Sequence, residues 1–505
     1  MRAEAAYAEL IKHFRELSVL ESCEDLLAWD EETYMPPRGV EHRGNQLALL
    51  AGMVHDRLTH PRVGELLDEL AGAGLVQEPY SVPETNVREL RRLYTRAIRL
   101  PRLLVEEIAR TTCLAQQAWT VAYRNSDFPH FQPWLEKIVV LMRQEADALG
   151  YATVAYDALL DEYEPGARSE QLADLFAALR QELIPLANHL TAVRRRPNVA
   201  ILRRTFPVDR QRQFVQRVAV AIGFDFQRGR LDSTTHPFST TIGPHDCRIT
   251  IRYDQGFCDA FFGMLHEIGH GLYEQGLDPD HYGTPMGESG SVGVHESQAR
   301  LWENTVGRSL SFWQYFYPTL QEAFPESLRD VGLDEFHLAI NQVEATPVRV
   351  GADEVTYNLH VMLRFELEQA LLKGDLPVSD LPDAWNEAYR HYLGIRPSND
   401  REGCLQDSHW SEGMIGYFPT YTLGNIMAAQ LFARAQKDLG DLDAAFARGD
   451  FTGLLGWLRA KVHRQGQRYS ATELIEAATG SPPDHCHLVE ALRRRYGGLY
   501  GLPEC

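Results

Sequence analysis

Apolar side chains recur every three or four residues along most of this 505-residue chain, which is the spacing of amphipathic helices. Leu10, Phe14 and Leu17 show it near the start, and residues 172–190 and 355–372 show it again later. Turn-forming pairs separate such segments: Pro36-Pro37, Pro165-Gly166 and Pro482-Pro483. No internal repeat or low-complexity linker breaks the pattern. We therefore predict a mainly α fold in which residues 1–505 form one large helical domain.

A short region, about residues 199–253, departs from this helical spacing. Apolar and polar positions alternate at its end: Cys247, Arg248, Ile249, Thr250, Ile251, Arg252 and Tyr253. This predicts a strand of a small β-sheet beside the helix that follows it. As an edge strand, it could pair through its main chain with an extended peptide of any sequence, which would give broad side-chain tolerance. The alternation fits equally well a half-buried strand whose polar side chains face water.

The helix that follows carries the main candidate chemistry. Apolar residues at helical spacing predict it, with a stop near Gly276: Phe257, Phe261, Met264, Leu265, Ile268 and Leu272. Within it lies His266-Glu267-Ile268-Gly269-His270. Four residues advance about 6 Å and turn about 40° past a full turn, so both imidazoles can hold one zinc ion, with Glu267 placed as a base. The alternative is that both histidines are hydrogen-bonded core residues.

A catalytic zinc ion usually takes a third protein ligand and keeps a position for water. Our prediction is Glu296, in the segment Gly293-Val294-His295-Glu296-Ser297-Gln298 at the start of an apparent helix. Glu303 and Glu288 are the alternatives. Glu303 could instead orient a ligand imidazole from behind, or be a solvated helix carboxylate. We place the metal-binding core at about residues 254–310.

Further segments, all in the same order, make the chain similar to the carboxypeptidase Taq family of thermostable metallocarboxypeptidases. Besides the zinc motif they are His236-Pro237-Phe238, Asp246-Cys247-Arg248-Ile249-Thr250, His295-Glu296-Ser297-Gln298, Val348-Arg349-Val350-Gly351-Ala352-Asp353 and Gly403-Cys404-Leu405-Gln406-Asp407-Ser408-His409-Trp410. Val348 conservatively replaces the family's isoleucine. Two N-terminal segments, from Trp29 to Pro37 and from Tyr163 to Gly166, also resemble the family, and we expect a structural role for them.

The resemblance implies a gluzincin of neurolysin-like architecture, mostly helical and split by a deep active-site groove into two lobes. It also implies one divalent metal ion per subunit, zinc or alternatively cobalt. The resemblance further implies that the protein releases C-terminal amino acids from peptides one at a time. It also implies a homodimer.

In the hydrolysis that these residues predict, Glu267 takes a proton from the activated water and returns it to the leaving amine. The tetrahedral oxyanion needs donors besides the metal, and we predict His409, from its motif, and Tyr421. Tyr417 could replace Tyr421 or contact the substrate. For either tyrosine, a packed ring with a satisfied hydroxyl is an equally good interpretation.

An exopeptidase must recognise the terminal carboxylate of its substrate, and a planar arginine fork does this well. Arg349 is our first prediction, because its motif places it near the start of a helix, and Arg248 is our second. The alternative for each is a structural ion pair, Arg349 with Asp353 and Arg248 with Asp246.

Composition narrows the list of partners. The chain holds 50 Lys plus Arg and 70 Asp plus Glu, a formal charge of −20, which opposes binding to nucleic acid. Its seven cysteines lack paired spacing, which argues against a disulfide framework. Charged residues interrupt the first twenty positions, and nowhere do 18 apolar residues run together. We therefore predict a cytoplasmic protein that acts on peptides and binds neither nucleic acid nor membranes.

Two other functions stay open from the sequence. An oligoendopeptidase or dipeptidase of similar helical fold would share the metal residues, but an endopeptidase would cut C-terminally amidated peptides, which a carboxypeptidase would not. A non-catalytic helical scaffold would hold a structural ion or none, so replacing Glu267 would remove no turnover.

Overall fold

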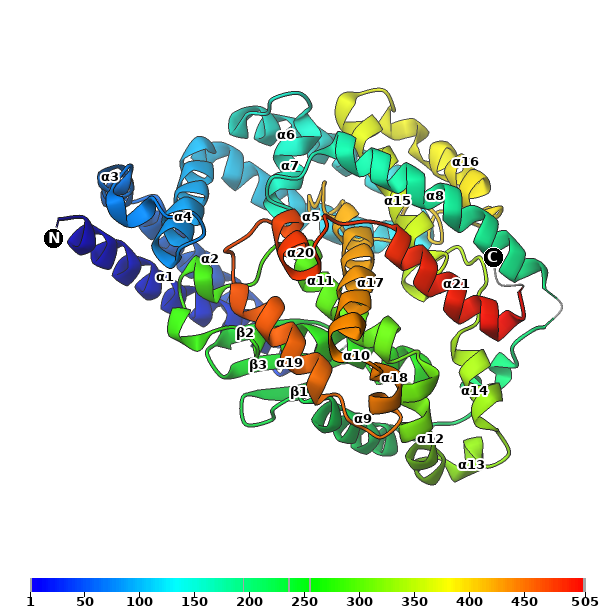
Figure 1. Ribbon diagram of the computed structural model, residues 1–505. Coiled ribbons are helices and arrows are strands. Elements are labelled where there is room, and N and C mark those ends of the chain that lie inside the picture. The colour runs from blue at the N-terminus through cyan, green and yellow to red at the C-terminus, as the bar shows by residue number, and fades with distance from the viewer. Residues whose placement is uncertain (1, 194, 235–236, 254–255, 503–505) are drawn as a thin grey trace. The chain divides into compact units, whose positions relative to one another are not determined.

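The computed structural model describes residues 2–193, 195–234, 237–253 and 256–502. Figure 1 shows a mostly helical chain with a small three-stranded sheet, which confirms the predicted fold class. Contacts between Cα atoms divide it into two compact units. Unit 1 comprises Met1–Ile98, Pro197–Ile340 and Ala428–Pro483, and unit 2 comprises Arg99–Arg196, Asn341–Met427 and Asp484–Cys505.

Unit 1 contains the sheet and the helix of the zinc motif. Its helices are α1 (Arg2–Thr33), α2 (Val40–Leu58), α3 (Pro61–Leu70), α4 (Val82–Arg99), α9 (Val208–Ile222), α10 (Phe257–Glu274), α11 (Val292–Arg300), α12 (Leu310–Ala323), α13 (Pro325–Leu328), α14 (Leu333–Ile340), α18 (Leu442–Phe446), α19 (Thr452–Lys461) and α20 (Ala471–Thr479). The helix α17 (Pro419–Leu439) crosses the boundary between the units, because unit 1 resumes at Ala428.

The helix α10 is held in unit 1 by aromatic rings along its first turns. Phe257 and Phe261 stack with ring centroids 5.1 Å apart and lie at most 1% exposed. The rings of Phe206 and Phe214 pack against them, and so does the ring of Trp313 on α12. Burying each such side chain stabilises the fold by about 1.5–3 kcal/mol, so the helix that presents His266 is rigidly seated.

The sheet consists of β1 (Gly229–Ser233), β2 (Ser239–Gly243) and β3 (Asp246–Ile251), in the order β1-β3-β2. β3 is the strand that the alternation predicted, but it is central, parallel to β1 and antiparallel to β2. The idea that it pairs with a peptide as an edge strand is therefore wrong. The strands also fill only residues 229–251 of the predicted region 199–253, because α9 occupies part of it.

One face of β3 packs on α10, as expected for a sheet beside the metal helix (Figure 1). Cys247 and Ile249 point toward Gly271 of α10, where an added Cβ would lie 2.7 Å from Ile249 Cδ1. Glycine at 271 thus allows the strand to approach the helix closely. Arg248, between these two residues in the sequence, points to the opposite face.

That opposite face contacts the N-terminal segment that resembles the family. The guanidinium groups of Arg230 and Arg248 lie over the ring of Trp29, at 5.0 and 4.3 Å from its centroid. Tyr34 donates a hydrogen bond of 2.7 Å to Asp232. These contacts support the structural role that we expected for the segment that begins at Trp29.

Phe238, from a second segment that resembles the family, is hydrogen-bonded to Thr250 of the sheet. The Thr250 hydroxyl accepts a hydrogen bond from the Phe238 N–H at 2.8 Å and donates one to the Phe238 carbonyl at 2.9 Å. Thr250 is fully buried, so these bonds satisfy a polar group that would otherwise destabilise the sheet. His236, the first residue of that segment, lies outside the described residues.

Unit 2 is built almost entirely from helices. They are α5 (Arg102–Asn125), α6 (Phe128–Leu149), α7 (Ala155–Tyr163), α8 (Ser169–Ala192), α15 (Tyr357–Lys373), α16 (Leu381–Leu393), the first turns of α17 and α21 (Cys486–Tyr500). The predicted helical stretches 172–190 and 355–372 correspond to α8 and α15. Within the described part of the chain, no helix combines the length and the apolar character needed to span a bilayer.

Candidate functional site

The helix α10 brings the zinc-motif histidines together as their spacing predicted. The two Nε2 atoms of His266 and His270 lie 3.2 Å apart, and the rings are nearly perpendicular. Both imidazoles are largely buried, with 19% and 14% of their side-chain surface exposed. Glu267, beside them on the helix, is buried as well.

Glu296 on α11 completes a set of three ligand atoms. Its Oε2 lies 3.6 Å from His266 Nε2 and 3.8 Å from His270 Nε2. Ligand atoms at 2.0–2.2 Å from a tetrahedral zinc ion are separated by about 3.4 Å, so these three atoms have the spacing of one face of such a tetrahedron. The donor set of two imidazoles and one carboxylate therefore fits a divalent zinc-like ion.

Glu303 lies behind His266 rather than in this triangle. It belongs to a π-helical segment, Leu301–Val306, that continues directly from α11. Its Oε2 lies 3.0 Å from His266 Nδ1, the ring nitrogen that faces away from Glu296. Such a contact fixes the tautomer and orientation of a metal-binding imidazole. π-Helical turns are rare and are often found at functional sites.

The electrostatics of this cluster reflect its burial. Burial alone would lower the pKa of His266, but Glu296 and Glu303 outweigh it and raise that pKa to about 9. Burial lowers the pKa of His270 well below its usual value, and the neighbouring imidazoles add to this effect. Burial also raises the pKa of Glu267 to about 7. In the metal-free protein, Glu267 can therefore hold or release a proton near neutral pH.

The other alternative ligand, Glu288, is not part of the triangle. It lines an acidic cavity with Glu21, Asp25 and Glu274. Burial raises the pKa of Glu288 to about 8, and repulsion from the carboxylate of Glu274 adds to this effect.

Gly269, inside the zinc motif, lets α11 approach α10 closely enough to deliver Glu296. A Cβ at this position would lie 2.6 Å from Ala299 Cα and 2.8 Å from the Gln298 carbonyl oxygen. Both are backbone atoms of α11, so they cannot move aside without shifting the whole helix. The sequence motif thus encodes a helix contact as well as two candidate ligands.

We predict that Gly269→Ala separates these helices and weakens both folding and metal binding. Overpacking of this kind costs about 1–3 kcal/mol of unfolding free energy. Gly263→Ala is the matched control, because it lies on the same helix with no atom within 4 Å of the added Cβ and should stabilise α10 slightly. Thermal unfolding and zinc titration of both variants test this. Equal behaviour of the two variants would show that the close approach is unimportant.

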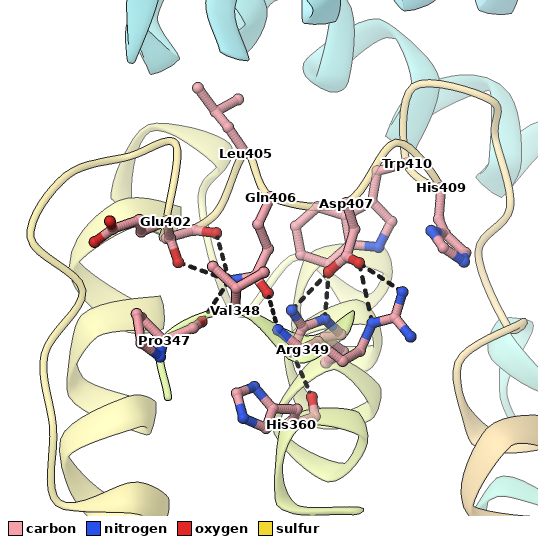
Figure 2. Close-up of polar contacts among 12 residues, drawn as sticks. Pro347, Val348, Arg349, His360, Glu402, Leu405, Gln406, Asp407, His409 and Trp410 are labelled. Atoms are coloured by element: carbon pink, nitrogen blue, oxygen red, sulfur yellow. Dashed lines mark hydrogen bonds and ion pairs between the residues drawn. The ribbon is translucent and has the colours of Figure 1, made fainter. Parts of the chain in front are cut away.

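Unit 2 holds a second cluster, centred on Asp407 (Figure 2). Oδ1 of Asp407 accepts hydrogen bonds from Nε and Nη2 of Arg349, at 3.0 and 2.8 Å. Oδ2 accepts one of 2.7 Å from Nε of Arg364. Arg349 also donates to the Tyr357 hydroxyl at 2.8 Å. Among these three ion-paired side chains, two guanidinium groups therefore face one carboxylate, which leaves this set with an excess of positive charge.

Asp407 and Arg349 hold each other in their charged forms. Burial opposes ionisation of Asp407, but Arg349 and Arg364 lower its pKa far below the usual range. Arg349 remains charged because Asp407 outweighs the effect of burial and raises its pKa. Arg364 is completely buried on α15.

Other residues of the motif from Gly403 to Trp410 support the cluster around Asp407. Gln406 accepts a hydrogen bond of 2.8 Å from the Arg349 N–H and donates to the Pro347 carbonyl at 2.9 Å, which fixes the turn that carries Arg349 (Figure 2). Trp410 donates a 2.9 Å hydrogen bond to Glu368, another fully buried residue of α15. The motif thus builds a rigid support around the two arginines.

We predict that Asp407→Asn destabilises the protein strongly. The change leaves two buried guanidinium groups without an anionic partner, and breaking a buried ion pair costs about 3–5 kcal/mol. Asp375→Asn is the control, because its pair with Lys373 is exposed and should cost less than about 1 kcal/mol. Unfolding in urea measures both variants. A loss at Asp407 no larger than at Asp375 would contradict this account.

His409, Tyr421 and Tyr417 lie together in the same unit. His409 Nε2 is 3.1 Å from the Tyr421 hydroxyl, and the ring of Tyr417 is 5.5 Å from that of His409. The guanidinium of Arg349 lies 4.9 Å from the Tyr421 ring centroid. Burial, reinforced by Arg349, lowers the pKa of His409 to about 4, so its imidazole is neutral at physiological pH.

The structure assigns different surroundings to the two predicted arginines. Arg248 forms two hydrogen bonds with Asp246, at 2.9 and 2.8 Å, on the sheet face away from α10. This matches the ion-pair alternative. Arg349 is also in an ion pair, but its partner is Asp407 rather than Asp353, so that part of the prediction is wrong. The Asp353 carboxylate instead accepts hydrogen bonds from the backbone N–H groups of residues 355 and 356, just before α15.

Sequence reasoning missed three residues of these clusters. Asp407 lies in the motif from Gly403 to Trp410, but the sequence alone assigns no role to it. Arg364 was visible as a charged position in the otherwise apolar stretch 355–372, a signal that a buried ion pair was required. Arg300, which contacts both Glu296 and Glu303, carried no signal beyond its helical spacing from them.

Comparison with known proteins shows the family to which this chain is similar. The sequence model of the carboxypeptidase Taq (M32) metallopeptidases matches residues 9–496. Thermostable carboxypeptidase 1 of Thermus thermophilus is 47% identical over 511 residues, which covers 99% of this chain and 100% of that relative. The chain belongs to the carboxypeptidase Taq family. Carboxypeptidase 1 of Bacillus subtilis is 38% identical, over 94% of this chain and 95% of its own length.

Solved structures agree with this assignment to the carboxypeptidase Taq family. The crystal structure of the M32 carboxypeptidase from Deinococcus radiodurans superimposes with a TM-score of 0.95 at 42% identity, over 98% of this chain and 100% of that one. The protein is therefore a metallocarboxypeptidase, a hydrolase that uses a divalent metal ion and for which peptides are fitting substrates.

Proposed function

We propose that this metallocarboxypeptidase releases single C-terminal amino acids from peptides with one zinc ion, held by His266, His270 and Glu296. The observation that carries the proposal is the spacing of the three ligand atoms, 3.2, 3.6 and 3.8 Å, which suits a tetrahedral ion with a position left for water. Cobalt prefers similar donors and is the alternative metal.

Glu267 would carry the protons of the reaction. A bound divalent ion supplies Lewis acidity, which polarises a carbonyl group and lowers the pKa of a neighbouring water molecule. Glu267 takes a proton from that water and gives it to the departing amine. Burial supports this role, since in the metal-free protein it raises the pKa of Glu267 to about 7 and so favours uptake of a proton by this carboxylate.

His409 and Tyr421 are our candidates for donating a hydrogen bond to the oxyanion. His409 Nε2 lies 3.1 Å from the Tyr421 hydroxyl, and when the neutral imidazole donates its Nε2–H to the tyrosine oxygen, the tyrosine proton is free to reach the oxyanion without a full positive charge on the pair. One such donor is worth about 3 kcal/mol of barrier. Tyr417, whose ring centroid lies 5.5 Å from that of His409 and 5.3 Å from that of Tyr421, would line the substrate position.

Arg349 would attract the terminal carboxylate of the peptide. Support comes from the excess positive charge that Arg349 and Arg364 leave around Asp407. Arg248 stays the second candidate for this contact, since Asp246 engages its guanidinium in the same way as Asp407 engages that of Arg349. Broad side-chain tolerance loses its structural argument, since β3 is a central strand. Homodimer formation and a cytoplasmic location stay predictions.

Mass spectrometry of a mixed peptide digest tests the proposed activity. Each peptide is supplied with a free and with an amidated C-terminus, with and without chelator, and zinc or cobalt is added back. We expect loss of single C-terminal residues from free peptides only, abolished by chelator and restored by metal. Cleavage of amidated peptides would favour an oligoendopeptidase, and trimming that persists after complete metal removal would contradict the proposal. The released residues measure side-chain tolerance directly.

A further inference from the structure

We propose that Arg300 is a positioning residue for the metal centre, which fixes how Glu296 presents one oxygen to the ion. This inference rests on the metal site proposed above and adds a residue outside the ligand set. Arg300 ends α11, four residues after Glu296 and three before Glu303.

The contacts of Arg300 divide the two oxygens of Glu296 between different partners. Nε of Arg300 donates a 2.6 Å hydrogen bond to Oε1 of Glu296, while Oε2 faces His266 and His270. A short charge-assisted hydrogen bond holds Oε1 toward the guanidinium and so fixes the orientation of the whole carboxylate group. Arg300 thus leaves Oε2 as the single oxygen offered to the ion.

The same guanidinium reaches the residue behind His266. Nη1 of Arg300 lies 3.3 Å from Oε2 of Glu303, and that oxygen is 3.0 Å from His266 Nδ1. The π-helical segment after Arg300 carries Glu303 into this position. Arg300 therefore links the carboxylate ligand Glu296 to the group that orients the imidazole ligand His266, and the rigid fork of arginine suits such a bridge.

Burial separates this arrangement from an ordinary helix ion pair. The side chains of Arg300, Glu296 and Glu303 are only 12%, 6% and 13% exposed. An exposed pair four residues apart contributes only about 0.3–0.5 kcal/mol to stability. Here a single cation lies between two buried carboxylates next to the ligand atoms, so its loss affects both the charge and the geometry of the site.

Metal affinity, measured by chelator competition, tests the proposal with two substitutions at this position. We expect Arg300→Gln to weaken zinc binding by about 10–100-fold, the usual effect of removing a residue that supports a metal ligand. Arg300→Lys should recover only part of this loss, because an ammonium ion keeps the charge but not the two-point fork. Full recovery with lysine would mean that charge alone matters and would overturn the positioning role, as would a Gln variant with unchanged affinity.

Visible absorption of the cobalt-substituted protein gives a second readout, which is sensitive to coordination. We expect the spectrum of Arg300→Gln to change, because Glu296 is then free to offer both oxygens. An unchanged spectrum would contradict the proposal. Arg88→Gln is the matched control, since Arg88 also bridges two carboxylates, Glu84 and Glu89, on α4. It should leave affinity and spectrum unaltered; a similar loss in this variant would show that the effect is not specific to the metal centre.

His270→Ala separates failure of this inference from failure of the metal site itself. If zinc affinity survives His270→Ala, the proposed ligand set is wrong whatever Arg300 does. If His270→Ala abolishes binding while Arg300→Gln binds as the natural protein does, the ligand set stands and only the role of Arg300 falls. Thermal unfolding of the metal-free proteins confirms that each variant is folded, and Arg300→Lys keeps the test valid if the glutamine variant is not.

Discussion

Replacing Glu267 with glutamine is expected to remove nearly all peptide hydrolysis while the protein keeps its metal and its fold. Glutamine preserves the size of the side chain but cannot accept a proton from water or return one to the amine. General acid–base catalysis accelerates a reaction by about 10²–10⁴-fold, so kcat should fall by about 100-fold or more. Because Glu267 is not one of the three ligand residues, metal content should stay at one ion per chain.

Two controls make the Glu267 experiment decisive. Elemental analysis and thermal unfolding of Glu267→Gln show whether metal and fold are retained. Glu322→Gln makes the same chemical change at an exposed position of α12 and should have natural activity. If Glu267→Gln kept more than about a tenth of natural kcat, another group would have to be the base.

Substitution of Arg349 by alanine is expected to lower kcat/KM for peptides with a free C-terminus by about 100-fold or more. A hydrogen bond to a charged group contributes about 1.5–3 kcal/mol, and the substitution also removes part of the excess positive charge near Asp407. Zinc content should be unchanged, because the predicted ligands all lie in unit 1. Steady-state kinetics with metal analysis measure both quantities.

The fold must be controlled in the Arg349 experiment, because this residue is also part of a buried ion pair. Arg349→Lys retains the charge and should lose less activity than Arg349→Ala, while Asp407→Asn reports the structural cost of disturbing the same pair. A folded Arg349→Ala protein with natural kcat/KM would reject carboxylate recognition and leave the ion pair as the whole role of Arg349.

Local spacing was enough to predict the helix of the zinc motif. A separation of four residues on α10 determines that His266 and His270 face the same way, and the apolar residues around them determine that the helix is buried. The strand β3 followed from alternation in the same manner. Its central position did not, because pairing partners depend on contacts between segments that spacing within one segment does not report.

Roles that depend on distant contacts were harder to predict. Glu296 and Glu303 lie seven residues apart on continuous helix, so the sequence could propose either as a ligand, and only the fold places one in front of His266 and the other behind it. For Arg349, nearby sequence offers Asp353 as the partner in the ion-pair alternative. The actual partner, Asp407, is 58 residues away and is brought close by the loop that Gln406 fixes.

Anomalous diffraction from crystals grown with zinc tests the central claim most directly. The account predicts one strong anomalous peak per chain at about 2.0–2.2 Å from Nε2 of His266, Nε2 of His270 and one oxygen of Glu296. A peak that is bound to Glu303 or Glu288 in place of Glu296, or that lies away from both imidazoles, would contradict it.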